Sequence, residues 1–237
     1  MRLCLVTDRR RLGAALAAPA GEWIDLLRQQ VAAAAAADID FVQIREPDLA
    51  ARPLLALVRS LLAVCRQSKT RILVNDRLDV VMAAGAPGVH LKESSLSPER
   101  ARQLARAVGS STAGNRAGTP EGLIVTCAVH TPLTAAARHS ADLLIAGTVL
   151  PTVSKSPTDY LQWKGLQQVV RAAKGTPVLG IGGLSLESIP SLAASGAAGL
   201  AAVGAFIPPP GHGALAEFVK NRVTEMRFAF DSAPNDP

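Results

Sequence analysis

The fold is decided by residues 71–92, which read RILVNDRLDVVMAAGAPGVHLK. Two short runs in this stretch, RILVND (71–76) and GVHL (88–91), have the composition of β-strands. In RILVND the apolar residues occupy both alternating faces, which is typical of strands that are covered on both sides, as in parallel sheets. The stretch therefore predicts neighbouring strands of a buried parallel sheet.

The same alternation of short strand candidates and longer helical segments runs along the whole chain. Further strands are expected at 3–8, 41–46, 123–129, 143–147, 177–183 and 199–206, and helices at 22–37, 53–67, 97–108 and 161–175. Eight strand candidates joined by right-handed helical crossovers predict a closed (β/α)8 TIM barrel. An open doubly wound sheet is the alternative, although no GxGxxG motif follows the first strand. We expect one domain, 1–237, with a frayed C-terminal tail from about residue 230.

Composition and charge narrow the classes of function. The net charge of +6 suits an anionic ligand, but the chain has only one Tyr, two Trp and five Phe for stacking on bases. Its densest basic run, Arg9-Arg10-Arg11, is expected to be a solvated loop, so we expect no nucleic-acid partner. The longest apolar stretch, 31–37, is far shorter than the roughly 20 residues of a membrane span. With no signal-peptide pattern and no disulfide framework, we expect a cytoplasmic protein without a membrane partner.

In a barrel of this kind the functional groups follow the carboxyl ends of the strands. This rule selects the candidate site residues Gln43, Arg45, Asn75, Asp76, Lys92, His130, Thr152, Ser154 and Lys155. Two glycine-containing pairs close the last two strand candidates, Gly182-Gly183 and Gly204-Ala205. Because glycines allow backbone N–H groups to approach an anion, these pairs predict a phosphate site. A pair of tight turns is the alternative interpretation.

The ordered motifs of the chain resemble the thiamine phosphate synthase/TenI family. They are LVTD, QIRE, NDRLD followed by AAGAPGVHL, a Thr-x-Ser-Lys run after Pro151, and GIGGL followed by GLAAVGAF, from about residue 2 to 207. The resemblance implies a (β/α)8 barrel and one of two activities. The synthase joins a pyrimidine pyrophosphate to a thiazole phosphate and releases pyrophosphate with Mg²⁺. The TenI branch includes a tautomerase that aromatises a thiazole carboxylate phosphate by proton transfer.

The chain departs from the synthase pattern at the pyrophosphate–Mg²⁺ subsite. An Arg-Glu-Lys triplet of the family reads Arg45-Glu46-Pro47 here, and Ser95 stands where the second metal carboxylate is expected. A serine of the fifth strand is replaced by Ala128. The family's Asn-Asp pair survives as Asn75 and Asp76, so Asp76 is the implied metal ligand if the protein is a synthase. Lys92 and Glu93 are candidates to compensate for the lost groups.

These departures favour a TenI-like thiazole tautomerase, with His130 as the catalytic proton-transfer group and no cofactor. A synthase that requires Mg²⁺ is the first alternative, and a non-catalytic thiazole-phosphate binding protein is the second. All three predict a phosphorylated thiazole as ligand, and the synthase adds the pyrimidine pyrophosphate. A homo-oligomer is compatible with the alanine-rich helices.

Two further arrangements are expected near the site. Cys127 and His130 lie three apart on one strand and therefore point to opposite faces, which predicts an inert thiol rather than a Cys/His pair. Arg45, Glu46 and Arg77 are expected to form an ion network in the wall of the site, with an Asp76–Glu46 acid–base pair as the alternative.

Overall fold

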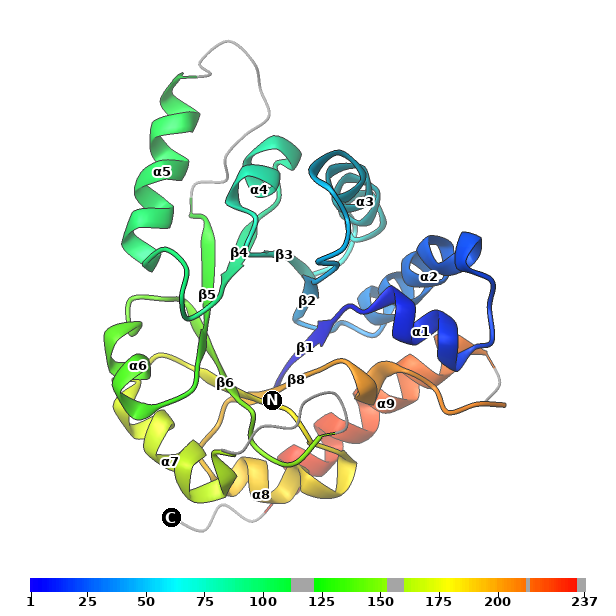
Figure 1. Ribbon diagram of the computed structural model, residues 1–237. Coiled ribbons are helices and arrows are strands. Elements are labelled where there is room, and N and C mark those ends of the chain that lie inside the picture. The colour runs from blue at the N-terminus through cyan, green and yellow to red at the C-terminus, as the bar shows by residue number, and fades with distance from the viewer. Residues whose placement is uncertain (112–121, 153–159, 212–213, 234–237) are drawn as a thin grey trace.

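The computed structural model describes residues 1–111, 122–152, 160–211 and 214–233. Within these residues, parallel strands β1 to β8 close into a barrel in chain order, and helices surround it (Figure 1). The barrel closes because β1 pairs with β8, with Cys4 opposite Ala201 and Leu5 opposite Ala202. The predicted (β/α)8 TIM barrel is therefore confirmed, and the open sheet is excluded.

The strands are β1 Arg2–Val6, β2 Phe41–Ile44, β3 Arg71–Asn75, β4 Gly88–Leu91, β5 Ile124–Val129, β6 Leu143–Gly147, β7 Val178–Ile181 and β8 Gly199–Ala202. The α-helices are α1 Arg9–Ala15, α2 Trp23–Ala36, α3 Ala51–Val64, α4 Leu78–Ala84, α5 Pro98–Ser111, α6 Pro132–Ala137, α7 Gln162–Ala172, α8 Ile189–Ala194 and α9 Leu215–Asp231. Short 3-10 helices are η1 Ala20–Glu22, η2 Leu186–Ser188 and η3 Gly204–Phe206.

Several boundaries differ from those expected from the sequence. The strand expected at 199–206 ends at Ala202, because the chain turns into η3 at Gly204. The tail expected to fray from about residue 230 is still helical there, since α9 extends to Asp231. The apolar periodicity of α9 keeps Val223 and Met226 buried and carries the helix past the predicted limit.

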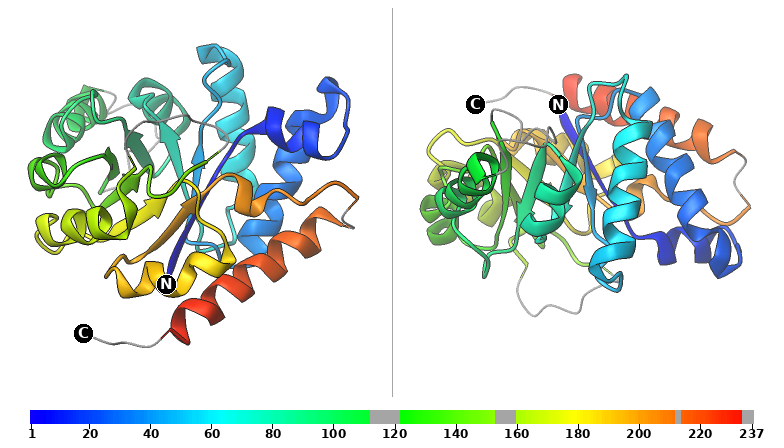
Figure 2. Two further views of the ribbon diagram at one scale, coloured as in Figure 1. Left: turned by 60° about the horizontal axis from the view of Figure 1, so that its bottom comes forward. Right: turned by 90° about the horizontal axis from the view of Figure 1, so that it is seen from above.

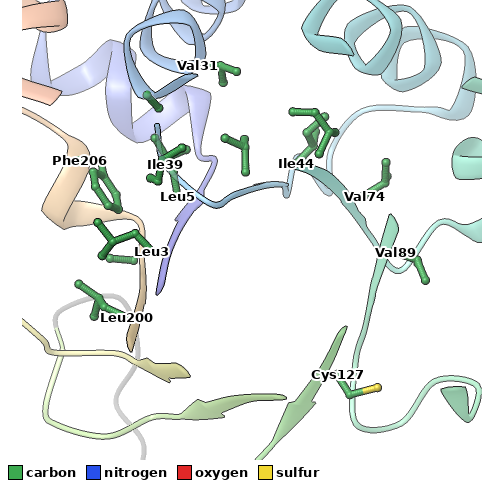
Figure 3. Close-up of a cluster of buried hydrophobic side chains, with 14 of the residues drawn as sticks. Leu3, Leu5, Val31, Ile39, Ile44, Val74, Val89, Cys127, Leu200 and Phe206 are labelled. Carbon is green, nitrogen blue, oxygen red and sulfur yellow. The ribbon is translucent and has the colours of Figure 1, made fainter. Parts of the chain in front are cut away.

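Most of the hydrophobic core lies between the strands and the surrounding helices. Leu3, Leu5, Ile44 and Leu200 are almost fully buried and point outward from the barrel toward this layer (Figure 3). The alanine-rich helix α2 packs beside α9 (Figure 2), and its small side chains allow a close approach. None of the described helices is long and apolar enough to cross a membrane.

A second, smaller cluster fills the inside of the barrel. It consists of the alternate residues of the same strands, namely Cys4, Val6, Leu143, Ile145, Leu179 and Ala201. Strand side chains alternate between two faces, so residues on the same face of the sheet as Cys4 and Val6 point to the barrel axis. This alternation determines which polar residues face the interior near the carboxyl ends.

His90 is one of these interior residues, and its buried ring lies against the hydroxyl of Thr126. Its Nδ1 lies 2.9 Å from Oγ1 of Thr126 on the neighbouring strand β5. Burial lowers the pKa of the imidazole to about 4, because the charged form would lose its hydration. His90 is therefore a neutral structural residue at physiological pH.

We expect Leu5→Ala to lower the free energy of unfolding by roughly 2–5 kcal/mol, because Leu5 is fully buried and the barrel cannot collapse around the gap. The matched control is Leu133→Ala, since Leu133 is 79% exposed and its truncation leaves no cavity. Urea denaturation of both variants measures the difference. Equal midpoints for the two variants would contradict the packing described here.

We expect the His90 imidazole to titrate near pH 4 by NMR. The unfolded chain, with a histidine pKa near 6.5, binds the proton more readily, so the fold loses stability as the pH falls from about 6.5 toward 4. Between pH 7 and pH 5 the wild type should lose about 1–2 kcal/mol more than His90→Gln, which keeps a hydrogen-bonding group for Thr126. An imidazole that titrates near 6.5 would refute this assignment.

Candidate functional site

The polar residues predicted for the site gather at the carboxyl edge of the barrel. By the strand alternation, Gln43, Asn75 and His90 share the inward parity, and Lys92 and His130 continue it just beyond β4 and β5. Gln43 is buried, Asn75 is half-buried, and Arg45, Lys92 and His130 are exposed. The edge between β2 and β5 therefore carries a polar surface above an apolar barrel interior.

Asp76 joins this edge through an unusual backbone conformation. Its φ of +58° lies in the left-handed region, and its N–H donates to the carbonyl of His90 over 2.7 Å. One carboxylate oxygen, Oδ2, lies 2.8 Å from Nζ of Lys92, and the other accepts a hydrogen bond from the Ser95 hydroxyl. Partial burial would raise the pKa of this carboxyl, but the bonds from Lys92 and Ser95 outweigh it and lower the pKa.

A pocket of about 440 Å³ opens beside this ion pair. Two of its lining residues, Asp76 and Ser95, belong to the hydrogen-bonded group just described. The full lining consists of Asp76, Leu78, Leu91, Ser94, Ser95 and Leu96. A small ligand in the pocket would meet apolar walls on the side of α4 and a polar rim at the loop after β4.

Glu93 holds His130 by two bonds from the next loop. Its Oε2 lies 2.7 Å from Nδ1 of the imidazole, and its Oε1 accepts from the His130 backbone N–H over 3.3 Å. Burial would raise the pKa of the Glu93 carboxyl, but the hydrogen bonds from Thr134 and His130 lower it, so it is ionised at neutral pH. A carboxylate on Nδ1 orients the ring and leaves Nε2 for another partner.

The expected network of Arg45, Glu46 and Arg77 is wrong. Glu46 instead accepts from Arg9 over 2.7 Å, and Arg9 also pairs with Asp48 at 2.5 Å. Arg77 pairs with Asp79 at 2.5 Å. Burial is the largest effect on Glu46 and raises its pKa despite the bonds from Arg9. Glu46 therefore ties α1 to the end of β2 and is not an acid–base partner of Asp76.

The run Arg9-Arg10-Arg11 is likewise not a solvated loop. It forms the first turn of α1, which Asp8 caps by accepting from the Arg11 N–H over 3.0 Å. Arg9 is buried and Arg10 is exposed but paired with Asp48 at 2.8 Å. An Asp cap before three residues without apolar periodicity was the only signal in the sequence that a helix begins here.

The glycine pairs lie at neighbouring strand ends, because β7 pairs with β8 and Ile181 stands opposite Ala201. Gly182 and Gly183 have φ values of +97° and +68°, and a β-carbon on Gly183 would collide with the carbonyl of Pro151. Gly204 and Ala205 begin η3 after β8. The arrangement brings both backbone segments to one side of the barrel mouth, as the sequence predicted.

Three predicted residues follow β6. Thr152 is half-buried in the loop that begins after this strand. Ser154 and Lys155 lie outside the described residues.

Cys127 points away from the barrel interior (Figure 3), whereas His130 has the inward parity. Burial raises the pKa of the Cys127 thiol to about 11, which keeps it protonated and unreactive. Cys127 and His130 therefore lie on opposite faces, as their spacing predicted.

The described residues do not fit a Mg²⁺ site built from two protein carboxylates. No group of three or more His, Cys, Asp or Glu converges anywhere in the described part of the chain. Asp76 is the carboxylate that the family pattern implies, and both of its oxygens already have partners in Lys92 and Ser95. Mg²⁺ needs free oxygen ligands in near-octahedral geometry, and an ammonium group on the same carboxylate opposes it electrostatically.

Comparisons with known proteins identify the family of the chain. The family model described as thiamine monophosphate synthase matches residues 18–119 and 111–206. A relative from Geobacter sulfurreducens, named "Putative thiamine-phosphate synthase", is 37% identical over 88% of this chain and 87% of its own length. A thiamine-phosphate synthase from Methanospirillum hungatei is 30% identical over 88% of this chain and 90% of its own.

Among solved structures, a thiamine phosphate pyrophosphorylase from Pyrococcus furiosus superposes with a TM-score of 0.71 at 24% identity, covering 98% of this chain and 96% of that one. A 3-hexulose-6-phosphate synthase superposes with a TM-score of 0.62 at 17% identity, covering 97% and 99%. At these identities the superpositions show the fold alone. Family membership follows from the sequence comparisons, which span most of the chain: the protein belongs to the thiamine monophosphate synthase family.

Proposed function

We propose that the protein is a thiamine-phosphate synthase, which joins a pyrimidine pyrophosphate to a thiazole phosphate and releases pyrophosphate. The sequence alone favoured the tautomerase, because three groups of the pyrophosphate subsite are missing. The relatives point the other way, since those from Methanospirillum hungatei and Methanoregula boonei carry the name thiamine-phosphate synthase at 30% and 31% identity. The synthase is therefore the function that the comparisons favour.

One observation at the site carries the proposal: the Lys92 ammonium is held at the barrel mouth by Asp76, 2.8 Å away. The reaction breaks the bond between the pyrimidine methylene carbon and the pyrophosphate oxygen, and the thiazole nitrogen forms the new bond. The leaving pyrophosphate takes the electron pair, so negative charge grows on its oxygens. A fixed cation at that position stabilises the charge, because it needs little reorganisation during the reaction.

The other site residues have supporting roles in this proposal. Arg45 and Asn75, beside Lys92 at the same edge, donate hydrogen bonds to the pyrophosphate. The backbone of Gly182-Gly183 and Gly204-Ala205 binds the phosphate of the thiazole on the opposite side of the mouth. Thr152 follows β6, between these two regions in chain order, and Ser154 and Lys155 come next in the sequence but lie outside the described residues.

The experiment that tests the proposal is a release assay for pyrophosphate with both substrates, with and without Mg²⁺. In this assay we expect Lys92→Ala to lower kcat/KM by roughly 10- to 100-fold, as for the loss of one charge-assisted hydrogen bond. Lys69→Ala is the matched control, because Lys69 is an exposed lysine just before β3, at the opposite end of the barrel. A wild type that releases no pyrophosphate in either condition would rule out the synthase.

The Glu93–His130 pair favours a second candidate, proton transfer on a thiazole carboxylate phosphate. A carboxylate on Nδ1 holds the ring in one orientation and leaves Nε2 for the substrate, as in catalytic triads. Both side chains are partly exposed at the mouth, so a substrate has access to Nε2.

For this second candidate we expect His130→Ala to abolish aromatisation of the thiazole, followed by NMR. Glu93→Gln should lower the rate about tenfold or more, because the ring loses the carboxylate that orients it. His139→Ala is the control, since His139 is an exposed histidine that follows α6 and precedes β6, at the far end of the barrel. An unchanged rate in Glu93→Gln would show that the pair does not act in proton transfer.

A further inference from the structure

The three arginines at the start of α1 are not equivalent. Arg9 is neutralised by Glu46 and Asp48, and Arg10 by Asp48. Arg11 contacts the Asp8 carboxylate through its own backbone N–H, which donates a hydrogen bond to it, and not through its guanidinium. Across the described ranges of the chain, no ion pair or side-chain hydrogen bond forms on the Arg11 guanidinium, which leaves an exposed cation at this end of the barrel.

The Arg11 guanidinium lies against the backbone of Gly204. A β-carbon placed on Gly204 would stand 2.8 Å from Nη2 and 3.3 Å from Cζ of Arg11. Any side chain at position 204 would therefore occupy the space that the guanidinium takes. Because Gly204 has no side chain, the Arg11 side chain of α1 can lie against it.

This contact spans the seam at which the barrel closes. α1 follows β1, Gly204 follows β8, and these two strands are paired neighbours. Gly182-Gly183 follow β7, the next strand round the barrel. Arg11 thus brings a positive side chain to the side of the mouth where two backbone segments offer N–H groups.

We propose that Arg11 binds the phosphate group of the thiazole substrate, as a side-chain ligand beside the backbone of Gly204. The planar guanidinium donates two parallel hydrogen bonds, which match the oxygens of a phosphate. A backbone site alone would supply only partial charges, whereas a phosphate monoester carries close to two negative charges at neutral pH. The inference rests on the proposed function for the identity of the substrate, but the anion site is testable without it.

Calorimetric titration of the full chain with inorganic phosphate and with thiazole phosphate tests the assignment. We expect Arg11→Ala to weaken binding of both about tenfold or more. Arg11→Lys should restore part of the affinity, because it keeps the charge but loses the bidentate geometry. The matched control is Arg10→Ala, which removes the same charge from the same helix at a residue paired with Asp48, and it should bind both ligands as the wild type does.

Gly204→Ala provides a second, independent variant. Its methyl group would displace the guanidinium, so it should weaken phosphate binding, and combining it with Arg11→Ala should add little further loss. In the synthase assay, Arg11→Ala should raise KM for thiazole phosphate about tenfold or more and leave KM for the pyrimidine pyrophosphate unchanged. Equal losses in Arg11→Ala and Arg10→Ala would overturn the inference, because the effect would then be one of general charge.

The outcomes separate this inference from the proposed function. If phosphate binding depends on Arg11 but no pyrophosphate is ever released, the anion site stands and the synthase proposal fails. If the synthase is active and Arg11→Ala matches the wild type in KM and affinity, the inference fails and the synthase proposal stands.

Discussion

The alternation of side chains along a closed ring of eight parallel strands is the constraint on which the rest of this structure depends. It sends Leu3 and Leu5 outward to the helices and Cys4 and Val6 inward to the axis, so that each strand serves two cores. The same parity continues past the strand ends and brings Lys92 and His130 over the mouth of the barrel. The chemistry of the site is therefore fixed by the packing of the barrel beneath it.

At the mouth of the barrel, three carboxylates are already paired with basic side chains. Asp76 is bound by Lys92, Glu93 by His130 and Glu46 by Arg9. Since these acids are compensated, the chain's formal excess of positive charge, +6, is carried by other basic groups, and Arg11 is an accessible one at the mouth. Exposed positive charge of this kind attracts anions, although the sequence contains no long basic tract.

Much of the fold could be predicted because strand composition and parity are local. RILVND and GVHL identified β3 and β4, and the spacing of Cys127 and His130 correctly placed them on opposite faces. The side-chain pairs could not be predicted in the same way. Whether Glu46 meets Arg9, Arg45 or Arg77 depends on how three loops pack after the strands end, and sequence spacing carries no information on that.

The candidate site shows the same difference between what the sequence could predict and what it could not. Its members were identified from strand ends, but their partners were not: Lys92 on Asp76 and Glu93 on His130 both join residues from separate loops. Arg11 was missed altogether, because a run of three arginines looks like a solvated surface until Gly204 is seen beneath one of them.

The pairing of β1 with β8 also has a consequence for how the protein is made. It joins residues 2–5 to residues 199–202, so β1 finds this second neighbour only after all the strands between them have been synthesised. Until then β1 is an open sheet edge, with unpaired N–H and C=O groups that can recruit strands from other chains. Long-range pairing of this kind slows folding, which lengthens the time for which that edge is exposed.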